Sequence, residues 1–170
     1  LKNFVKDTNI ILHSREFFPI EISIKKSHNG NSISQENLIN PLNVLKNLCQ
    51  FSFKDKKIIH MLIENYQIDG KDYSFLPENL KCNNFSLDIK FICLSKNLIE
   101  HYESVLKRYH ILVNQILNAK YIEQFQDQQN PNIYTTASRI ISGLNNNEIS
   151  LVNKTLKSKG FFEKFFDLFS

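Results

Sequence analysis

The stretch that decides the fold is Phe85-Ser86-Leu87-Asp88-Ile89-Lys90-Phe91-Ile92-Cys93-Leu94. Apolar and polar side chains alternate through most of it, which is typical of a strand with one buried face. An earlier run, 57–69, is also predicted to be a strand, with Ile58-Ile59-His60-Met61-Leu62-Ile63 at its centre. Asp69-Gly70-Lys71-Asp72 is predicted to be a turn, because Asp and Gly tolerate the backbone angles of tight turns. Residues 73–84 are predicted to be an irregular loop.

The residues before these two strands predict a strand, a loop and a helix. Residues 20–25 alternate like a half-buried strand, 27–31 have loop composition, and 9–12 could form a further short strand. Ser34 is a candidate N-cap for a helix over 35–49. Apolar residues recur in it at helical spacing and form one face. Pro41 lies inside this helix and is expected to be its weak point. The face consists of Leu38, Leu42, Leu45 and Leu48.

The residues after residue 94 predict two further helices and one ambiguous segment. Ser95 is a candidate N-cap for a helix whose apolar face comprises Leu98, Ile99, Tyr102, Val105, Leu106 and Tyr109. Residues 111–122 fit either a strand or a continued helix. A polar linker, 123–130, precedes a helix with apolar residues at Ile133, Ala137, Ile140, Ile141 and Leu144. Gly143 is expected to end that helix.

This order of elements predicts an α+β fold, a small sheet with helices packed on one face. The expected units are a domain over 1–125, a linker with one helix over 126–150, and a basic C-terminal segment over 151–170. Alternation and helical periodicity together predict that residues 20–121 form one compact α+β unit. Its predicted core includes Ile22, Ile24, Leu45, Ile59, Leu62, Phe91, Leu94, Leu98, Val105 and Leu112.

Composition limits the class of protein. A length of 170 residues fits one ordinary domain with appendages, and no run of 18 apolar residues predicts a transmembrane helix. The N-terminus lacks both a starting Met and the apolar core of a signal peptide, so a fragment or a processed chain is expected. The net charge of +4 is mild and scattered, which argues against nucleic acid as a partner. Cys49, Cys82 and Cys93 form no CxxC pair, so a reducing compartment is expected.

No motif for catalysis or for a cofactor is found. The glycines are too far apart for a phosphate-binding loop, and neither HExxH nor GxSxG occurs. His101 and His110 are not spaced for a shared metal, and His60 in a strand is expected to be packed or exposed. Asp69 with Asp72, and Glu100 with Glu103, fit a turn and a solvated helix start better than paired acid–base catalysis. The chain is therefore predicted to be no enzyme and to have no cofactor.

The C-terminal segment carries the most specific functional signal. On a helix, six large apolar residues share an arc of roughly 160°, with Glu163, Lys164, Asp167 and Ser170 opposite. Lys154, Lys157 and Lys159 precede it, and the side chains of 154–170 sum to +2. An aromatic face with a basic flank is typical of a helix that lies in a membrane interface. The predicted membrane-binding residues are Phe161, Phe162, Phe165, Phe166, Leu168 and Phe169, with Lys157, Lys159 and Lys164.

Several segments resemble the bacterial cell-division protein FtsA. Residues 33–38 resemble that family's I-S-E-E-D-V helix start, and 57–69 resemble its R-V-L-H-V-I-P-Q-E-Y-A-I-D strand. Residues 87–94, 97–109 and 112–121 are similar to the following strand, helix and strand of subdomain 1C. Residues 132–137 with Gly143-Leu144 resemble a P-E-Y-A-T-A…G-L segment near the end of FtsA. A C-terminal membrane-targeting helix then follows in the family, as 161–169 would here.

The chain also departs from the FtsA pattern. The phosphate-binding loops of the family are missing, and 76–82 lacks the family's glycine. The subdomain that docks the FtsZ tail has no counterpart. The resemblance therefore implies membrane attachment and subdomain packing, but neither ATP binding nor direct FtsZ binding.

Two functions remain open from the sequence. The first is a reduced, FtsA-like divisome adaptor at the cytoplasmic face of the bacterial inner membrane. Its partners would be an anionic membrane surface and other division proteins, or further copies of itself, through the 1C-like domain. The second is a soluble protein–protein interaction domain whose terminal helix packs on its own core or in a partner's groove.

Overall fold

The computed structural model describes residues 4–77, 79–129 and 131–149. They form an α+β fold, as predicted. The C-terminal segment with the predicted membrane-binding side chains lies outside the described residues. The elements in chain order are β1 (Asp7–Leu12), β2 (Phe18–Ser32), α1 (Glu36–Ser52), β3 (Lys56–Ile68), β4 (Lys71–Tyr73), β5 (Lys81–Ser95), α2 (Lys96–Lys107), β6 (Leu112–Asn118), α3 (Ala119–Glu123) and α4 (Ile133–Ile141).

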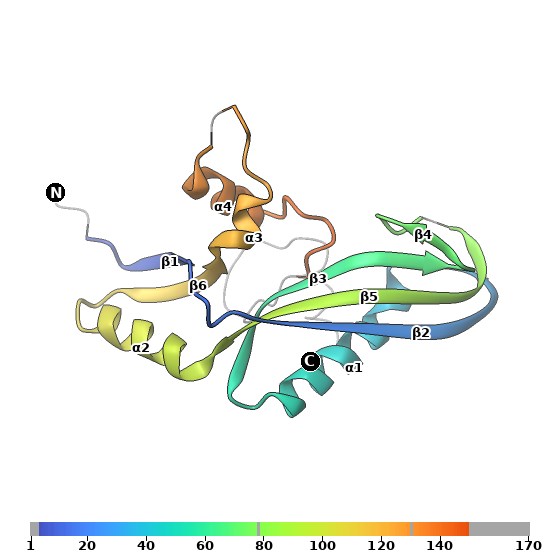
Figure 1. The fold of residues 1–170 in the computed structure, drawn as a ribbon, viewed down its shortest axis with the longest axis horizontal. Coiled ribbons are helices and arrows are strands. Elements are labelled where there is room, and N and C mark those ends of the chain that lie inside the picture. The colour runs from blue at the N-terminus through green and yellow to red at the C-terminus, as the bar shows by residue number, and fades with distance from the viewer. Residues whose placement is uncertain (1–3, 78, 130, 150–170) are drawn as a thin grey trace.

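The main sheet has four antiparallel strands in the order β2-β5-β3-β4 (Figure 1). The stretch with the strongest alternation lies in β5, between the two other long strands. A second sheet consists of β1 and β6, which pair in parallel beside one end of the main sheet. Two segments that are far apart in the chain therefore meet at this end.

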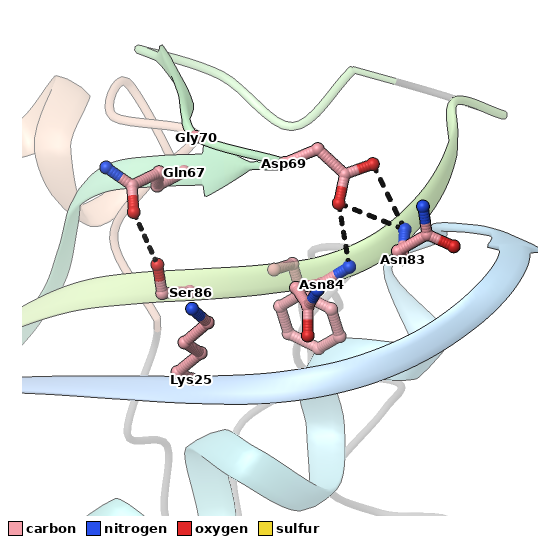
Figure 2. A pocket seen from close by; sticks show the side chains of 8 residues that line it. Lys25, Gln67, Asp69, Gly70, Asn83, Asn84 and Ser86 are labelled. Carbon is pink, nitrogen blue, oxygen red and sulfur yellow. Dashed lines mark hydrogen bonds between the residues drawn. The ribbon is translucent and has the colours of Figure 1, made fainter.

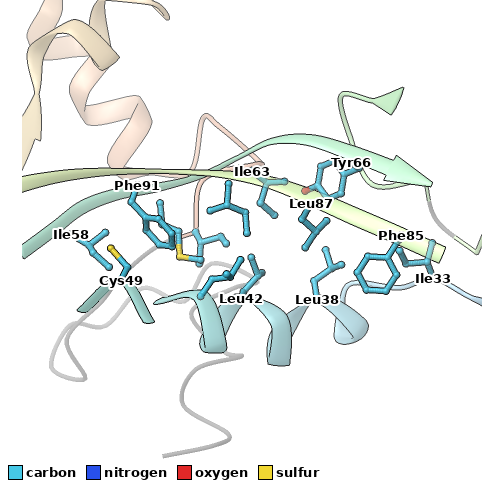
Figure 3. Packing of buried hydrophobic residues seen from close by; sticks show 14 of the residues in the cluster. Ile33, Leu38, Leu42, Cys49, Ile58, Ile63, Tyr66, Phe85, Leu87 and Phe91 are labelled. Carbon is cyan, nitrogen blue, oxygen red and sulfur yellow. The ribbon is translucent and has the colours of Figure 1, made fainter. Parts of the chain in front are cut away.

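The largest apolar core lies between α1 and one face of the main sheet (Figure 3). Alternate residues of β5, including Phe85, Leu87 and Phe91, point toward the helix and are buried. α1 places Leu38, Leu42, Leu45 and Cys49 against them at intervals of three and four residues. The helix continues through Pro41, which is buried and lies in its second turn.

Among the described residues, those that cover the opposite face of the sheet lie at the end where β6 is. There Leu62 of β3 and Ile92 of β5 pack against Tyr121 and Ile122 of α3 and against α4. A smaller cluster joins Leu94, Ile99 of α2 and Ile116 of β6. The prediction of helices on one face therefore holds for the face that α1 covers. At the end near β6, α3 and α4 also pack on the opposite face.

The predicted turn between β3 and β4 is confirmed. Asp69 and Gly70 are the two central residues of a hairpin in which Ile68 pairs with Lys71, and both have positive φ, 45° and 81°. Positive φ at both positions defines a type I′ turn, whose twist matches that of the strands. The Asp69 carboxylate also accepts hydrogen bonds from the backbone N–H groups of Asn83 and Asn84, which fixes the start of β5.

Several predicted boundaries differ from the structure. The loop predicted over 27–31 lies within β2, where an irregularity between Ser27 and Asn31 interrupts the pairing with β5. The loop predicted over 73–84 is shorter, because β5 begins at Lys81. The ambiguous segment 111–122 contains both alternatives, since β6 ends at Asn118 and α3 follows at once. Asn118 caps α3 by accepting a hydrogen bond from the Tyr121 N–H.

The predicted core is correct in the sheet and wrong at its margins. Leu45, Leu62, Phe91 and Leu94 are buried, while Ile22, Ile24, Ile59 and Leu98 are partly buried against the clusters. Val105 and Leu112 are exposed, at 36% and 67%, as is Leu48 at 51%. These side chains have the right period, but the described part of the chain covers them incompletely. Periodicity identifies an apolar face without identifying what packs on it.

Candidate functional site

The described residues present an exposed apolar stripe along one flank of α1. Val44, Leu48 and Phe51 follow one another at intervals of four and three residues, so they share a helix face. Their side chains are 59%, 51% and 72% exposed, and they lie beside the buried face of α1 rather than within it. The Nζ atom of Lys54 lies 5.1 Å from the centre of the Phe51 ring. Adjacent large apolar side chains on one exposed face indicate a surface for another protein segment or a membrane.

A second group of exposed apolar side chains lies where β1 meets β6. Phe4 and Val5 precede β1, and Tyr109 and Leu112 flank the start of β6. The Leu112 N–H donates a hydrogen bond to the Lys6 carbonyl, so these two chain segments are neighbours. Leu112 was expected in the core but belongs to this surface. The described residues therefore include two separate groups of exposed apolar side chains, one at α1 and one at β6.

The most polar buried cluster surrounds His60 on β3. His60 is 2% exposed, and its Nδ1 lies 2.7 Å from Oε1 of Glu148. The other carboxylate oxygen of Glu148 accepts a hydrogen bond of 2.6 Å from the Tyr121 hydroxyl. Asn145 donates to that hydroxyl, and the backbone N–H of Asn118 donates to Nε2 of His60. The network thus connects β3, β6, α3 and the segment after α4.

The network around His60 fits a structural role better than catalysis. Because the Asn118 N–H donates to Nε2, the ring proton lies on Nδ1 and points at Glu148. Both ring nitrogens are therefore occupied, and burial leaves neither one facing a substrate. Burial, together with the neighbouring Glu148 carboxylate, raises the pKa of Tyr121. A tyrosine that stays protonated is a constant donor to Glu148, so the network holds the segment 145–149 on the sheet.

Sequence reasoning placed His60 in a strand and allowed for packing, but it missed Glu148. The two residues are 88 positions apart. Glu148 follows an Asn-rich stretch that has the composition of a loop, which gives no sign of a buried partner. The backbone explains the contact, because Leu62 and Glu148 form an antiparallel bridge beside which Ile149 donates to the Met61 carbonyl.

A polar hollow of about 410 Å³ lies between β2, β5 and the β3–β4 turn (Figure 2). Its lining includes Lys25, Gln67, Asp69, Asn83 and Ser86. As Figure 2 shows, Asp69 uses its carboxylate to bind the backbone of β5. Ligand pockets are usually concave and mostly apolar, with a few polar groups free to bind. The polar residues around the hollow therefore fit a role in fixing the hairpin better than a role in binding a ligand.

The rest of this sheet face carries cross-strand polar pairs. Lys90 on β5 lies 3.1 Å from Glu21 on β2 and 3.1 Å from Glu64 on β3. Hydrogen bonds to these two carboxylates raise the pKa of Lys90. Next to this triplet, the Ser23 hydroxyl donates to the Asp88 carboxylate at 2.6 Å. The pairs connect β2, β5 and β3 on the face away from α1.

The cysteines are part of the core. Cys49 and Cys93 are buried and hydrogen-bond to each other between α1 and β5. Burial, with the neighbouring Cys49, raises the pKa of Cys93 to about 12. Thiols in such surroundings are poor nucleophiles and poor metal ligands.

Neither a metal cluster nor a spanning helix is found in the part of the chain that the structure describes. No three His, Cys, Asp or Glu side chains there are close enough to hold a metal ion, so His101, His110, Glu100 and Glu103 form no such group. No helix of that part is long and apolar enough to cross a bilayer. No protein-family model matches the chain, and no curated protein matches it.

Proposed function

We propose that the chain is a non-enzymatic, FtsA-like divisome adaptor that its C-terminal segment attaches to the cytoplasmic face of the bacterial inner membrane. The sequence pattern that carries the proposal is the aromatic run of residues 161–169. If this segment is helical, its sequence places six large apolar side chains on one face, beside basic residues, which suits the boundary between headgroups and acyl chains. Each Phe buried there contributes on the order of 1.5–3 kcal/mol before the helix is ordered.

The element order from β2 to β6 supports the FtsA-like part of the proposal. It runs strand, helix, strand, strand, helix, strand when the short β4 is left aside. The resemblance to subdomain 1C implies this same order. The exposed apolar side chains at α1 and at the start of β6 supply two surfaces on which other division proteins could dock.

Vesicle co-sedimentation of the full chain tests the membrane proposal. The variant Phe165→Glu with Phe166→Glu places two charges within the aromatic run and is expected to abolish pelleting with anionic vesicles. The control, Ser158→Glu with Ser170→Glu, adds the same charge but keeps all the aromatic residues, and it is expected to retain most of the binding. Salt is expected to weaken the binding without abolishing it, because burial of apolar surface dominates. Equal pelleting of both double variants would contradict the proposal.

The stripe on α1 favours a second candidate function, a protein–protein interaction domain whose C-terminal helix packs on its own core. Val44, Leu48 and Phe51 present the kind of surface on which an amphipathic helix packs. In that case Leu48→Glu and the Phe165→Glu/Phe166→Glu variant would each lower the thermal midpoint in the absence of vesicles. Their effects would be non-additive, because both disrupt one contact. The adaptor proposal expects neither variant to change the midpoint by more than a surface substitution does.

A further inference from the structure

The two outer edges of the main sheet are covered unequally. On one side of the sheet, the edge of β3 that faces away from β5 is paired with β4 at one end and with residues 147–149 near its middle. The outer edge of β2 pairs with no strand among the described residues, although β2 is 15 residues long. Long uncovered edges present unpaired backbone N–H and C=O groups, which readily pair with another strand.

Pro19 indicates which residues of β2 point their backbone groups outward. Proline has no N–H, so a strand accepts it where that group would face away from the neighbouring strand. Pro19 pairs with Ile92 of β5. Along a strand, the backbone N–H and C=O groups of successive residues point alternately to one neighbouring strand and to the opposite side. Glu21, Ser23 and Lys25 share the parity of Pro19. Their N–H and C=O groups therefore face the open edge.

The usable part of this edge is limited at both ends. Pro19 limits it at the start, and the irregularity between Ser27 and Asn31 limits it at the other end. Asn29 and Gly30 in that irregularity have positive φ, 54° and 75°, so the strand departs there from extended geometry. The window between them contains one acidic and one basic side chain on the outward-facing positions, Glu21 and Lys25.

We propose that β2 is an interface between two copies of this chain, whose β2 strands pair antiparallel about a two-fold axis at Ser23. The sequence of the window complements itself in this register. Glu21 of one copy lies opposite Lys25 of the other, and this contact occurs twice. A two-fold axis at Glu21 or at Lys25 would instead place like charges opposite each other, which is destabilising. Closed two-fold pairing is the commonest form of homo-oligomer.

The apolar face of β2 complements itself in the same register. Ile20, Ile22 and Ile24 point toward α1 but are only partly buried within one copy. Pairing about Ser23 places Ile22 of one copy opposite Ile24 of the other, at the closer of the two strand spacings. The two main sheets would then form one continuous antiparallel sheet, with both α1 helices on the same face. The inference concerns β2 alone and does not rest on membrane binding by the C-terminal segment.

Sedimentation of charge-reversal variants tests the pairing. We expect the mass of the full chain to rise with concentration from 20.0 kDa toward twice that value. Glu21→Lys and Lys25→Glu are each expected to remain monomeric where the unchanged protein is dimeric. An equimolar mixture of the two variants is expected to dimerise, because each contact then joins opposite charges. Lys57→Glu on β3 is the control for charge alone and is expected to dimerise normally.

The same series in the Phe165→Glu/Phe166→Glu background separates this interface from association through the C-terminal segment. Dimerisation through β2 persists in that background, whether or not the chain binds membranes. Register is tested by mild oxidation, which is expected to cross-link Ser23→Cys to its own copy. Ser27→Cys is the control, because the two positions 27 would lie about 27 Å apart. The proposal is overturned by a chain that stays monomeric, by dimers that both single reversals leave intact, or by equal cross-linking at positions 23 and 27.

Discussion

The two faces of the main sheet are stabilised by different interactions. Under α1, contact is almost entirely apolar, and a single cluster extends from Ile33 to Ile149. At the β6 end, the opposite face has smaller apolar clusters, and the polar network of His60, Tyr121 and Glu148 joins four chain segments. Apolar contact favours burial but tolerates many arrangements, whereas a hydrogen-bonded network has few satisfactory geometries. We infer that α1 supplies most of the stability and that the network fixes the position of the segment 145–149.

The largest expected effect comes from the apolar face. Phe91→Ala removes a side chain that is fully buried beneath α1, and it should cost about 3–5 kcal/mol of unfolding free energy. Phe75→Ala is the matched control, because Phe75 is 64% exposed and its loss should stay within about 0.5 kcal/mol. Chemical unfolding curves of both variants provide the measurement. Similar midpoints for the two would contradict the inferred role of the α1 face.

A smaller effect is expected from the network. His60→Ala removes the partner of the Asn118 N–H and of Oε1 of Glu148, while Oε2 keeps its bond from Tyr121, and this should cost about 1–3 kcal/mol. Hydrogen exchange should accelerate most at the amides of Ile63 and Ile149, which bond to Asn147 and Met61. The control is His101→Ala, on the exposed surface of α2. If exchange at those amides were no faster than in the control, the network would have no part in holding the segment.

The smallest effect is expected at Tyr66, which connects the two regions. Its ring belongs to the α1 core, and its hydroxyl donates to Asn147 in the segment after α4. Burial raises the pKa of Tyr66 from 10.0 to about 12. Below pH 10 the hydroxyl is protonated in both the folded and the unfolded state. Between pH 10 and 12 only the unfolded state loses the proton, so stability falls as pH rises.

Tyr66→Phe should therefore reduce the fall in unfolding free energy between pH 10 and pH 12, by about 1–2 kcal/mol near pH 12. Part of the loss should remain in this variant. The pKa values of Cys93 and Lys90 are also raised in the folded state, so the stability linked to these two groups also falls as pH rises. Unfolding midpoints measured between pH 8 and 12 check this effect, with Tyr134→Phe as the exposed control. An unchanged slope would mean that Tyr66 titrates normally in the folded chain.

The parts of the fold that follow from short-range pattern could be predicted. β5 alternates clearly, Asp69-Gly70 has the residues that a type I′ turn requires, and Gly143 ends α4 in a left-handed conformation with φ of 89°. The interruption of β2 by Asn29 and Gly30 was predicted as a loop, because composition does not distinguish a loop from an irregular strand.

The parts that depend on distant segments could not be predicted. Val105 and Leu112 have correct periodicity, but described segments leave both of them exposed. Two contacts join residues that are far apart in the sequence: the contact between His60 and Glu148, and the parallel pairing of β1 with β6. Membrane binding by Phe161 and its neighbours stays a prediction, since those residues lie outside the described part of the chain.

The bridge between Leu62 and Glu148 determines how the domain would respond to mechanical load. It lies at the point where the described chain ends, and the Ile149 and Ile63 amides flank it with bonds to the Met61 and Asn147 carbonyls. If a membrane holds the C-terminal segment, any tension along that segment first reaches these bonds. They join it directly to β3, which lies inside the main sheet, rather than to a peripheral helix. Tension would thus be transmitted to a strand that has neighbours on both sides, with α4 outside the path of the force.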